Sequence, residues 1–115
     1  MTIGISVVII VTLMIAYLFM KDSSELWSLK TCLNEVRHKL PKEERKKLEH
    51  VNIHLTDTSI GYCINGRDIG IYKTYGKRYN VTQRDVLLHE ISHILSGETQ
   101  HTKKFWEYFR YLKSL

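Results

Sequence analysis

Residues 3–20 form a run of apolar side chains, IGISVVIIVTLMIAYLFM, that contains no charged residue. As an α-helix at about 1.5 Å per residue this run spans roughly 27 Å, close to the thickness of the hydrocarbon core of a bilayer. A helix that is apolar on every face has to be surrounded by protein or by lipid, and the rest of this chain is too small to surround it.

Two uses of such a segment remain, a cleavable signal peptide and a membrane anchor. A signal peptide carries basic residues before the apolar run and small residues at its end. Here no Lys or Arg precedes the run, and the bulky residues 17–20 (YLFM) close it. A single transmembrane anchor over residues 1–20 is therefore the interpretation that fits best.

The charged part of the chain begins directly after this run. All 17 Lys and Arg and all 12 Asp and Glu residues fall in residues 21–115, which we expect to form one small folded domain with a net charge of +5. Positive charge on the C-terminal side of an anchor, beginning at Lys21, favours a domain on the cytoplasmic side. Cys32 and Cys63 favour neither compartment, and the sequon at Asn80 would matter only in a lumenal domain. Nothing in the sequence predicts an oligomeric state.

The periodicity of residues 21–115 predicts an α+β domain in the order helix, small sheet, helix, helix. Apolar residues spaced by three and four indicate an amphipathic helix from Ser23 to Leu40, with Ser23 or Ser24 as its N-cap and Pro41 as its stop. The charge-dense residues 42–50 are expected to be a solvated connector or a helix extension.

Three runs rich in β-branched and aromatic residues predict a three-stranded sheet over residues 51–55, 60–64 and 69–72. Asn65-Gly66 lies between the second and third runs and is a strong hairpin signal, so these two strands are expected to pair antiparallel.

Two helices are predicted after the sheet. Thr82 and Asp85 resemble a capping box at the start of the first, and Gly97 favours its end. The second begins after Thr102, and its apolar face consists of Phe105, Trp106, Phe109 and Leu112.

The motif His89-Glu90-Ile91-Ser92-His93 lies inside the first of these helices. Histidines at i and i+4 lie one above the other on a helix face, so both imidazoles can bind one metal ion. Glu90 projects beside the first histidine, where it can act on a water molecule without binding the metal. Zinc-dependent hydrolysis needs both groups, because the metal ion activates the water and a carboxylate that does not bind the metal accepts and returns the proton.

A catalytic zinc has three protein ligands and one open position. His101 is the candidate for the third ligand, because Gly97 can turn the chain back between it and His93. Glu107 on the last helix, and after it Glu98, are the reserve candidates. The remaining histidines have no ligand-like spacing and are predicted to lie on the surface: His38, His50 and His54.

The segment LLHEISHILSGETQHTKKFWEYFRYL resembles the WLM and SprT-like minimal zinc metallopeptidases. In that group an HExxH helix is followed by a third histidine and, three or four residues later, by an aromatic residue, here His101 with Phe105. The resemblance covers roughly residues 26–112 and is sharp over residues 87–106. It implies a small gluzincin-like zincin domain in which His89, His93 and His101 bind zinc and Glu90 is the general base.

Two features of the motif depart from related patterns. The gap between His93 and His101 is longer than in the WLM pattern. The metzincin signature HExxHxxGxxH with a downstream methionine is excluded, because no methionine follows Met20. Some relatives are DNA-dependent proteases with additional nucleic-acid-binding segments that this short chain lacks.

The function we expect from the sequence is a membrane-anchored zinc metallopeptidase, with residues 21–115 as the catalytic domain and a protein or peptide as substrate. The alternative is a catalytically inactive, zinc-stabilised module that binds a protein partner at the membrane, since a structural metal adds folding free energy to a small core. A nucleic-acid contact through the basic clusters at residues 45–47 and 77–78 is disfavoured, because the interleaved tyrosines have the spacing of strand packing.

Two further expectations concern the substrate. Zincins often bind an extended peptide along an edge strand beside the HExxH helix, and the order along the chain makes residues 69–73 the expected edge. Three tyrosines are candidates for an oxyanion-stabilising hydroxyl, and the sequence does not choose among them: Tyr79, Tyr108 and Tyr111.

Overall fold

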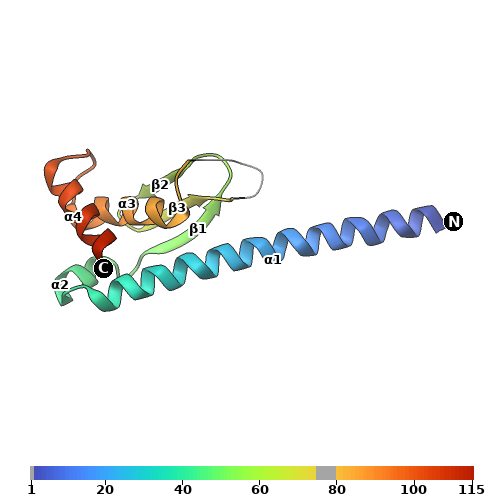
Figure 1. The fold of residues 1–115 in the computed structure, drawn as a ribbon, viewed down its shortest axis with the longest axis horizontal. Coiled ribbons are helices and arrows are strands. Elements are labelled where there is room, and N and C mark those ends of the chain that lie inside the picture. The colour runs from blue at the N-terminus through green and yellow to red at the C-terminus, as the bar shows by residue number, and fades with distance from the viewer. Residues whose placement is uncertain (1, 75–79) are drawn as a thin grey trace.

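The structure is a computed structural model that describes residues 2–74 and 80–115, with only the backbone of residues 2 and 3 (Figure 1). It is an α+β chain, as the sequence predicts. Its elements in order are α1 (Thr2–Lys39), α2 (Lys42–Lys47), β1 (Asn52–Thr56), β2 (Gly61–Ile64), β3 (Asp68–Tyr72), α3 (Gln83–Ser96) and α4 (Lys103–Ser114).

The apolar run and the amphipathic segment form one continuous helix, α1, of 38 residues. The prediction of a separate helix that starts at Ser23 or Ser24 is wrong. No Gly or Pro interrupts residues 5–40, and serine disfavours a helix interior only weakly, so the helix continues through both serines. It ends at Lys39, as expected from Pro41. The apolar segment and the domain therefore share a single helix (Figure 1).

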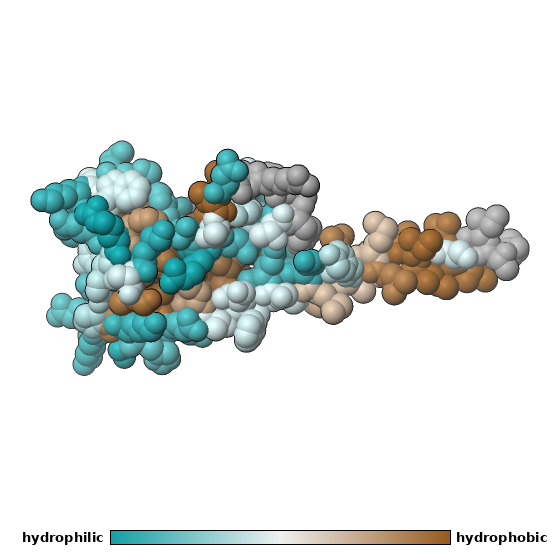
Figure 2. Space-filling model, in the orientation of Figure 1, coloured by the Kyte–Doolittle hydropathy of each residue, from teal (hydrophilic) through white to brown (hydrophobic). Residues whose placement is uncertain are grey.

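The N-terminal half of α1 projects from the domain without packing on it. Residues 4–21 are exposed, and within the described residues α1 is the one helix long and apolar enough to cross a membrane, with none of its apolar window buried. On the face that Figure 2 shows, this half of α1 is mostly brown, whereas the domain is largely teal and white with a few brown areas. By length and composition, a signal sequence would have the same properties.

The three strands form a sheet in the order β1-β3-β2. The hairpin prediction is confirmed, because β2 and β3 pair antiparallel across Asn65 and Gly66, which have φ values of 56° and 63°. β1 pairs parallel with the other edge of β3. The expectation that residues 69–73 form an edge is therefore wrong, and β3 is the central strand. Its two isoleucines, Ile69 and Ile71, are fully buried.

The helix boundaries after the sheet agree with the predicted caps. The side chain of Thr82 accepts a hydrogen bond from the Asp85 amide at 3.1 Å, and Gly97 ends α3 with a left-handed φ of 69°. Thr102 caps α4 in the same way by accepting a hydrogen bond from the Phe105 amide. α3 packs on β2 and β3, α1 packs on β1 and α3, and α4 packs on α3.

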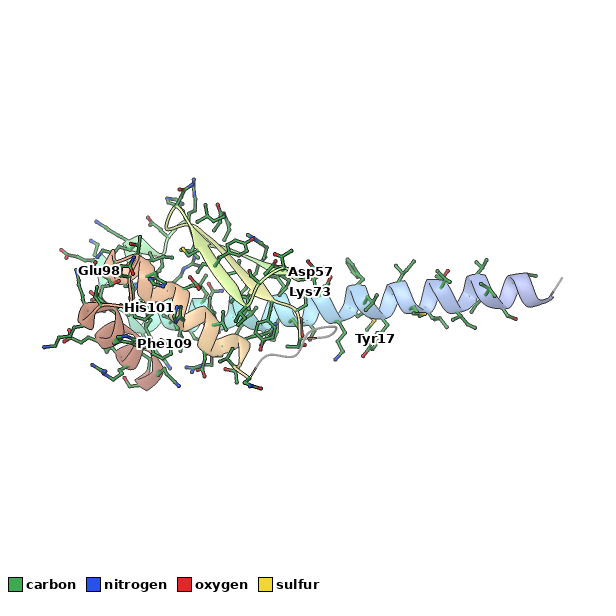
Figure 3. The ribbon with its side chains drawn as sticks, turned by 90° about the horizontal axis from the view of Figure 1, so that it is seen from above. Tyr17, Asp57, Lys73, Glu98, His101 and Phe109 are labelled. Carbon is green, nitrogen blue, oxygen red and sulfur yellow. The ribbon has the colours of Figure 1, made fainter. Side chains whose placement is uncertain are left out.

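α3 packs against α1 and, like it, runs from the end of the domain near the apolar segment towards the opposite end (Figure 1). At the start of α3, the Gln83 side chain donates a hydrogen bond to the Tyr72 carbonyl at 2.8 Å. Lys73, the residue after Tyr72, forms an ion pair with Asp22 of α1 at 3.4 Å. At the end of α3, Lys47 of α2 donates to the Leu95 carbonyl at 3.2 Å. In Figure 3, Lys73 lies at the end of the sheet nearer to Tyr17, and His101 lies at the opposite end of the domain.

Candidate metal centre

The structure brings the three predicted histidines together. One ring nitrogen from each of His89, His93 and His101 lies within 4.8 Å of the others, and the two Nε2 atoms of His89 and His101 are 3.1 Å apart. The first two project from α3, one helical turn apart. The third lies directly before α4, where the Thr102 cap fixes the start of that helix.

This donor set fits a zinc ion. Zn–N bonds of about 2.0–2.1 Å in a tetrahedral site place the ligand nitrogens roughly 3.3 Å apart, and imidazole is among the preferred zinc ligands. The His89–His101 separation of 3.1 Å already matches that value, and the widest separation of 4.8 Å has to close by about 1.5 Å. Because His89 and His101 already have the required separation, this movement concerns His93.

A backbone carbonyl orients His93. Its Nδ1 atom lies 2.8 Å from the Glu98 carbonyl oxygen, which can only accept, so Nδ1 carries the hydrogen and Nε2 keeps its lone pair for a metal. Two local features hold this carbonyl in place. Gly97 adopts the left-handed conformation before it, and the Glu98 amide donates to Ser96 Oγ at 3.1 Å.

An aromatic wall from α4 covers one side of the three histidines. The Phe105 ring is fully buried, and its centroid lies 4.9, 4.5 and 4.8 Å from those of His89, His93 and His101. Trp106 extends the wall towards solvent, with its ring centroid 5.7 Å from that of His101. Burial, followed by the neighbouring His93 and His101, lowers the pKa of His89 to about 4, so its imidazole is neutral at pH 7 and able to bind a metal.

Glu90 points to the sheet side of α3 and is only 7% exposed. Burial raises the pKa of its carboxyl group, and the nearby His93 opposes that shift. The carboxylate faces β2 at Gly61, where an added Cβ would lie 3.6 Å from Glu90 Oε1 and 2.4 Å from Val86 Cγ1. Glycine at this position therefore allows the edge strand to approach α3 beside Glu90.

An open cleft of about 440 Å³ lies between the β2–β3 hairpin and the C-terminal half of α3. Glu90 and His93 form part of its wall, so the carboxylate and one candidate ligand are accessible from the same side. The residues that line it are Cys63, Asn65, Gly66, Glu90, His93, Ile94, Gly97, Glu98 and Thr99. Burial, then the charge of Glu90, raises the pKa of the Cys63 thiol.

The structure separates the reserve ligands from the three histidines. The Glu98 side chain lines the cleft but does not join the group of ligand atoms, and Glu107 is exposed in a different depression between α2 and α4. Among the described residues the group consists of the three histidines alone. The surface positions predicted for the other histidines are confirmed, because all three are exposed: His38, His50 and His54.

Of the three candidate tyrosines, the two that the structure describes do not adjoin the histidine group. Tyr108 and Tyr111 line the depression between α2 and α4, and the Tyr108 hydroxyl donates a hydrogen bond to Glu44 Oε1 at 3.1 Å. The structure therefore favours neither of these two candidates for an oxyanion-stabilising hydroxyl. Tyr79 lies outside the described residues, as do the basic residues 77 and 78.

Sequence reasoning missed two contributors to the site. Gly61 was available as a signal, because an isolated glycine in a strand often marks a close approach of another element. The Glu98 carbonyl had no signal of its own, since any residue at that position would supply it.

No protein-family model, no curated protein and no solved structure matches this chain.

Proposed function

We propose that this chain is a membrane-anchored zinc metallopeptidase of the type that WLM and SprT-like enzymes represent, with residues 1–20 as anchor and residues 21–115 as catalytic domain. One observation supports it most strongly. Three imidazoles converge within 4.8 Å, while Glu90, inside the same motif, stays out of that group and lines the adjoining cleft.

The number of ligands favours catalysis over a purely structural zinc. Structural sites are closed by four protein ligands, whereas catalytic sites have three and leave one position for water or substrate. Among the described residues no cysteine or carboxylate joins the three histidines. A zinc-stabilised module without activity would also have no use for a buried carboxylate at position 90.

The chain's own groups divide the work as follows. His89, His93 and His101 would hold the ion, which when bound would lower the pKa of a water towards about 7 and polarise a peptide carbonyl. Glu90 would accept the proton of the attacking water and return it to the leaving amine. Its raised pKa suits this role, because a general acid–base group works best when its pKa approaches the working pH.

We propose that the substrate binds along β2 rather than β3. The backbone amides of Tyr72 and Arg67 donate to the carbonyls of Ile60 and Ile64. The backbone groups of β2 that point towards β3 therefore alternate with those of Gly61 and Cys63, which point to the open edge of the sheet. These outward groups lie beside Glu90 and the cleft. An extended peptide can pair with them as an added strand, which would bring its scissile bond to the histidine side of the cleft.

The anchor is proposed to place the domain on the cytoplasmic side. α1 enters the domain at Lys21, the first charged residue of the chain, whose ammonium lies 5.9 Å from the Tyr17 ring centroid. An aromatic ring and a lysine one turn apart are typical of the membrane–water interface, and positive charge favours the cytoplasmic face.

The test is hydrolysis of a quenched fluorescent peptide library by the purified full chain, with Glu90→Gln beside Glu98→Gln. The second variant is a matched control, since it removes a carboxylate from the same cleft. We expect Glu90→Gln to bind zinc normally and to lose at least about 100-fold in rate, as for removal of a general base. Equal rates for Glu90→Gln and wild type would refute the mechanism. A wild-type chain that binds zinc and cleaves nothing in the library would favour the zinc-stabilised module.

A further inference from the structure

We propose that the end of the domain nearest the anchor rests on the bilayer surface through Ile60, Lys73 and Val81, which we call the rim. The proposal rests on the membrane anchor proposed above but not on the peptidase chemistry. It assigns the rim one partner, the lipid headgroup region around the point where α1 leaves the membrane.

The position of the bilayer surface along α1 follows from charge. No charged residue precedes Lys21, and the exposed Tyr17 lies one turn earlier with its ring near the lysine ammonium. The hydrocarbon core therefore ends close to residue 20. Beyond it, the headgroup region of one leaflet is roughly 5–7 Å thick.

Two contacts hold the end of β3 at this level. Lys73 forms an ion pair with Asp22 at 3.4 Å, and the Thr74 amide donates to Glu25 Oε1 at 3.2 Å. Asp22 and Glu25 lie one and four residues beyond Lys21, which corresponds to about 1.5 and 6 Å along a helix. Both contacts therefore fall within the depth of the headgroups.

The apolar members of the rim are tied to the same level through Tyr72, the residue before Lys73. The Tyr72 amide donates to the Ile60 carbonyl at 3.1 Å, and its hydroxyl donates to the Val81 carbonyl. Both β-branched side chains are 44% exposed, although they come from different loops. In Figure 3 the labelled Asp57 and Lys73 mark this end of the sheet, on the side of the domain that faces Tyr17.

The chemistry of the rim suits a membrane surface. Two exposed β-branched side chains at the level where α1 leaves the membrane match the pattern of interfacial protein segments, in which apolar groups enter the headgroup boundary, while the ion pair of Lys73 holds this end of the sheet at that level.

Contact of the rim with the bilayer would set the distance between the candidate metal centre and the membrane surface. α3 begins at the rim, where Gln83 bonds to Tyr72, and His89 follows six residues later, roughly 9 Å farther along the helix. The histidines and the cleft would then face chain segments just outside the bilayer rather than within it.

The test measures quenching of single tryptophans by brominated phosphatidylcholine. The full chain is reconstituted into liposomes that also contain phosphatidylserine. In a background that carries Trp27→Phe and Trp106→Phe, tryptophan is introduced at the rim by Ile60→Trp or Val81→Trp. The matched control is Ile64→Trp, because Ile64 is 52% exposed and lies at the opposite end of β2, about 13 Å from Ile60. Leu13→Trp reports the anchor separately. Circular dichroism verifies the fold of each variant.

We expect strong quenching for Leu13→Trp, at least twofold quenching for both rim variants, and no quenching for Ile64→Trp. Quenching at Leu13 without quenching at either rim position would overturn the rim proposal and leave the anchor intact. Equal quenching at Ile60 and Ile64 would also overturn it, because the domain would then lie on the membrane by another face. No quenching at Leu13 would overturn both the anchor and the rim.

Discussion

The close approach of β2 to α3 at Gly61 gives the sharpest prediction about how the site is built. In the Gly61→Ala variant the new methyl group would lie 2.4 Å from Val86 Cγ1, and ordinary contact begins at 3.4 Å, so the two atoms have to move about 1 Å apart. Val86 is 7% exposed and its β-branched side chain has little rotamer freedom, so the strand or the helix has to shift.

Overpacking of this size typically costs about 1–3 kcal/mol, and we expect about 2 kcal/mol for Gly61→Ala. Val86→Ala removes two buried carbons and is expected to cost about 2 kcal/mol alone. In the double variant the methyl group of residue 61 occupies the space that Val86 vacates. Its cost should therefore stay near 2 kcal/mol, well below the sum of the two single costs.

Urea unfolding of the full chain in detergent micelles, followed by circular dichroism in the presence of a chelator, measures all three free energies. A double-mutant coupling of at least about 1 kcal/mol would support the close contact. Costs that add within about 0.5 kcal/mol would refute it, because independent sites add. Peptidase activity should fall by up to about 100-fold in Gly61→Ala, since a displacement of about 1 Å beside the catalytic carboxylate disturbs substrate geometry.

Two further predictions concern the histidines. The folded chain holds the pKa of His89 at about 4, below its ordinary value of 6.5, so the unfolded state binds this proton more readily. The stability that comes from a neutral His89 is complete above pH 6.5 and is lost as the pH falls towards 4. In the metal-free chain, the free energy of unfolding of the wild type should therefore fall more over this range than that of His89→Asn. An identical fall would contradict the lowered pKa of His89. Gly97→Ala strains a residue with φ of 69° and displaces the carbonyl that orients His93, so we expect zinc affinity to fall about 10- to 100-fold. Gly66→Ala strains a comparable φ of 63° in the hairpin and should leave zinc affinity unchanged; equal affinities for the two variants, measured by competition with a chromogenic chelator, would contradict this role.

Local features of this fold were predictable from sequence because neighbouring residues determine them. Asn65-Gly66 adopts the positive φ values that its residue types favour, and the hairpin follows. Thr82 caps α3 as expected, and α4 begins after Thr102 as predicted, since a threonine hydroxyl can accept from an amide three residues later.

Features that depend on contacts between distant segments were not predictable in the same way. Strand order places β3 in the centre because β1, which precedes the hairpin, pairs with its free edge. The apolar residues of β3 are compatible with either position. The continuity of α1 through Ser23 and Ser24 was missed for a different reason: serine has a mild propensity effect, and the packing of the following residues on the sheet outweighs it.

The site shows the same division. The spacing of His89 and His93 fixes their common face, so their proximity follows from helix geometry alone. The approach of His101 depends on how α4 returns over α3, and the sequence offered only Gly97 and an aromatic residue as hints. The positions of Tyr108 and Glu107 on the far side of α4 were missed because they depend on where α2 packs.

The zinc content of the purified full chain is the measurement on which the proposed metal centre depends most directly. It is determined by atomic emission after dialysis against buffered zinc, with wild type compared with His101→Ala and with His54→Ala, which removes an exposed histidine of β1. We expect one zinc per chain in wild type and in His54→Ala, and loss of most of it in His101→Ala. A folded wild-type chain that binds no zinc, or a His101→Ala variant that retains it with unchanged affinity, would contradict the three-histidine site.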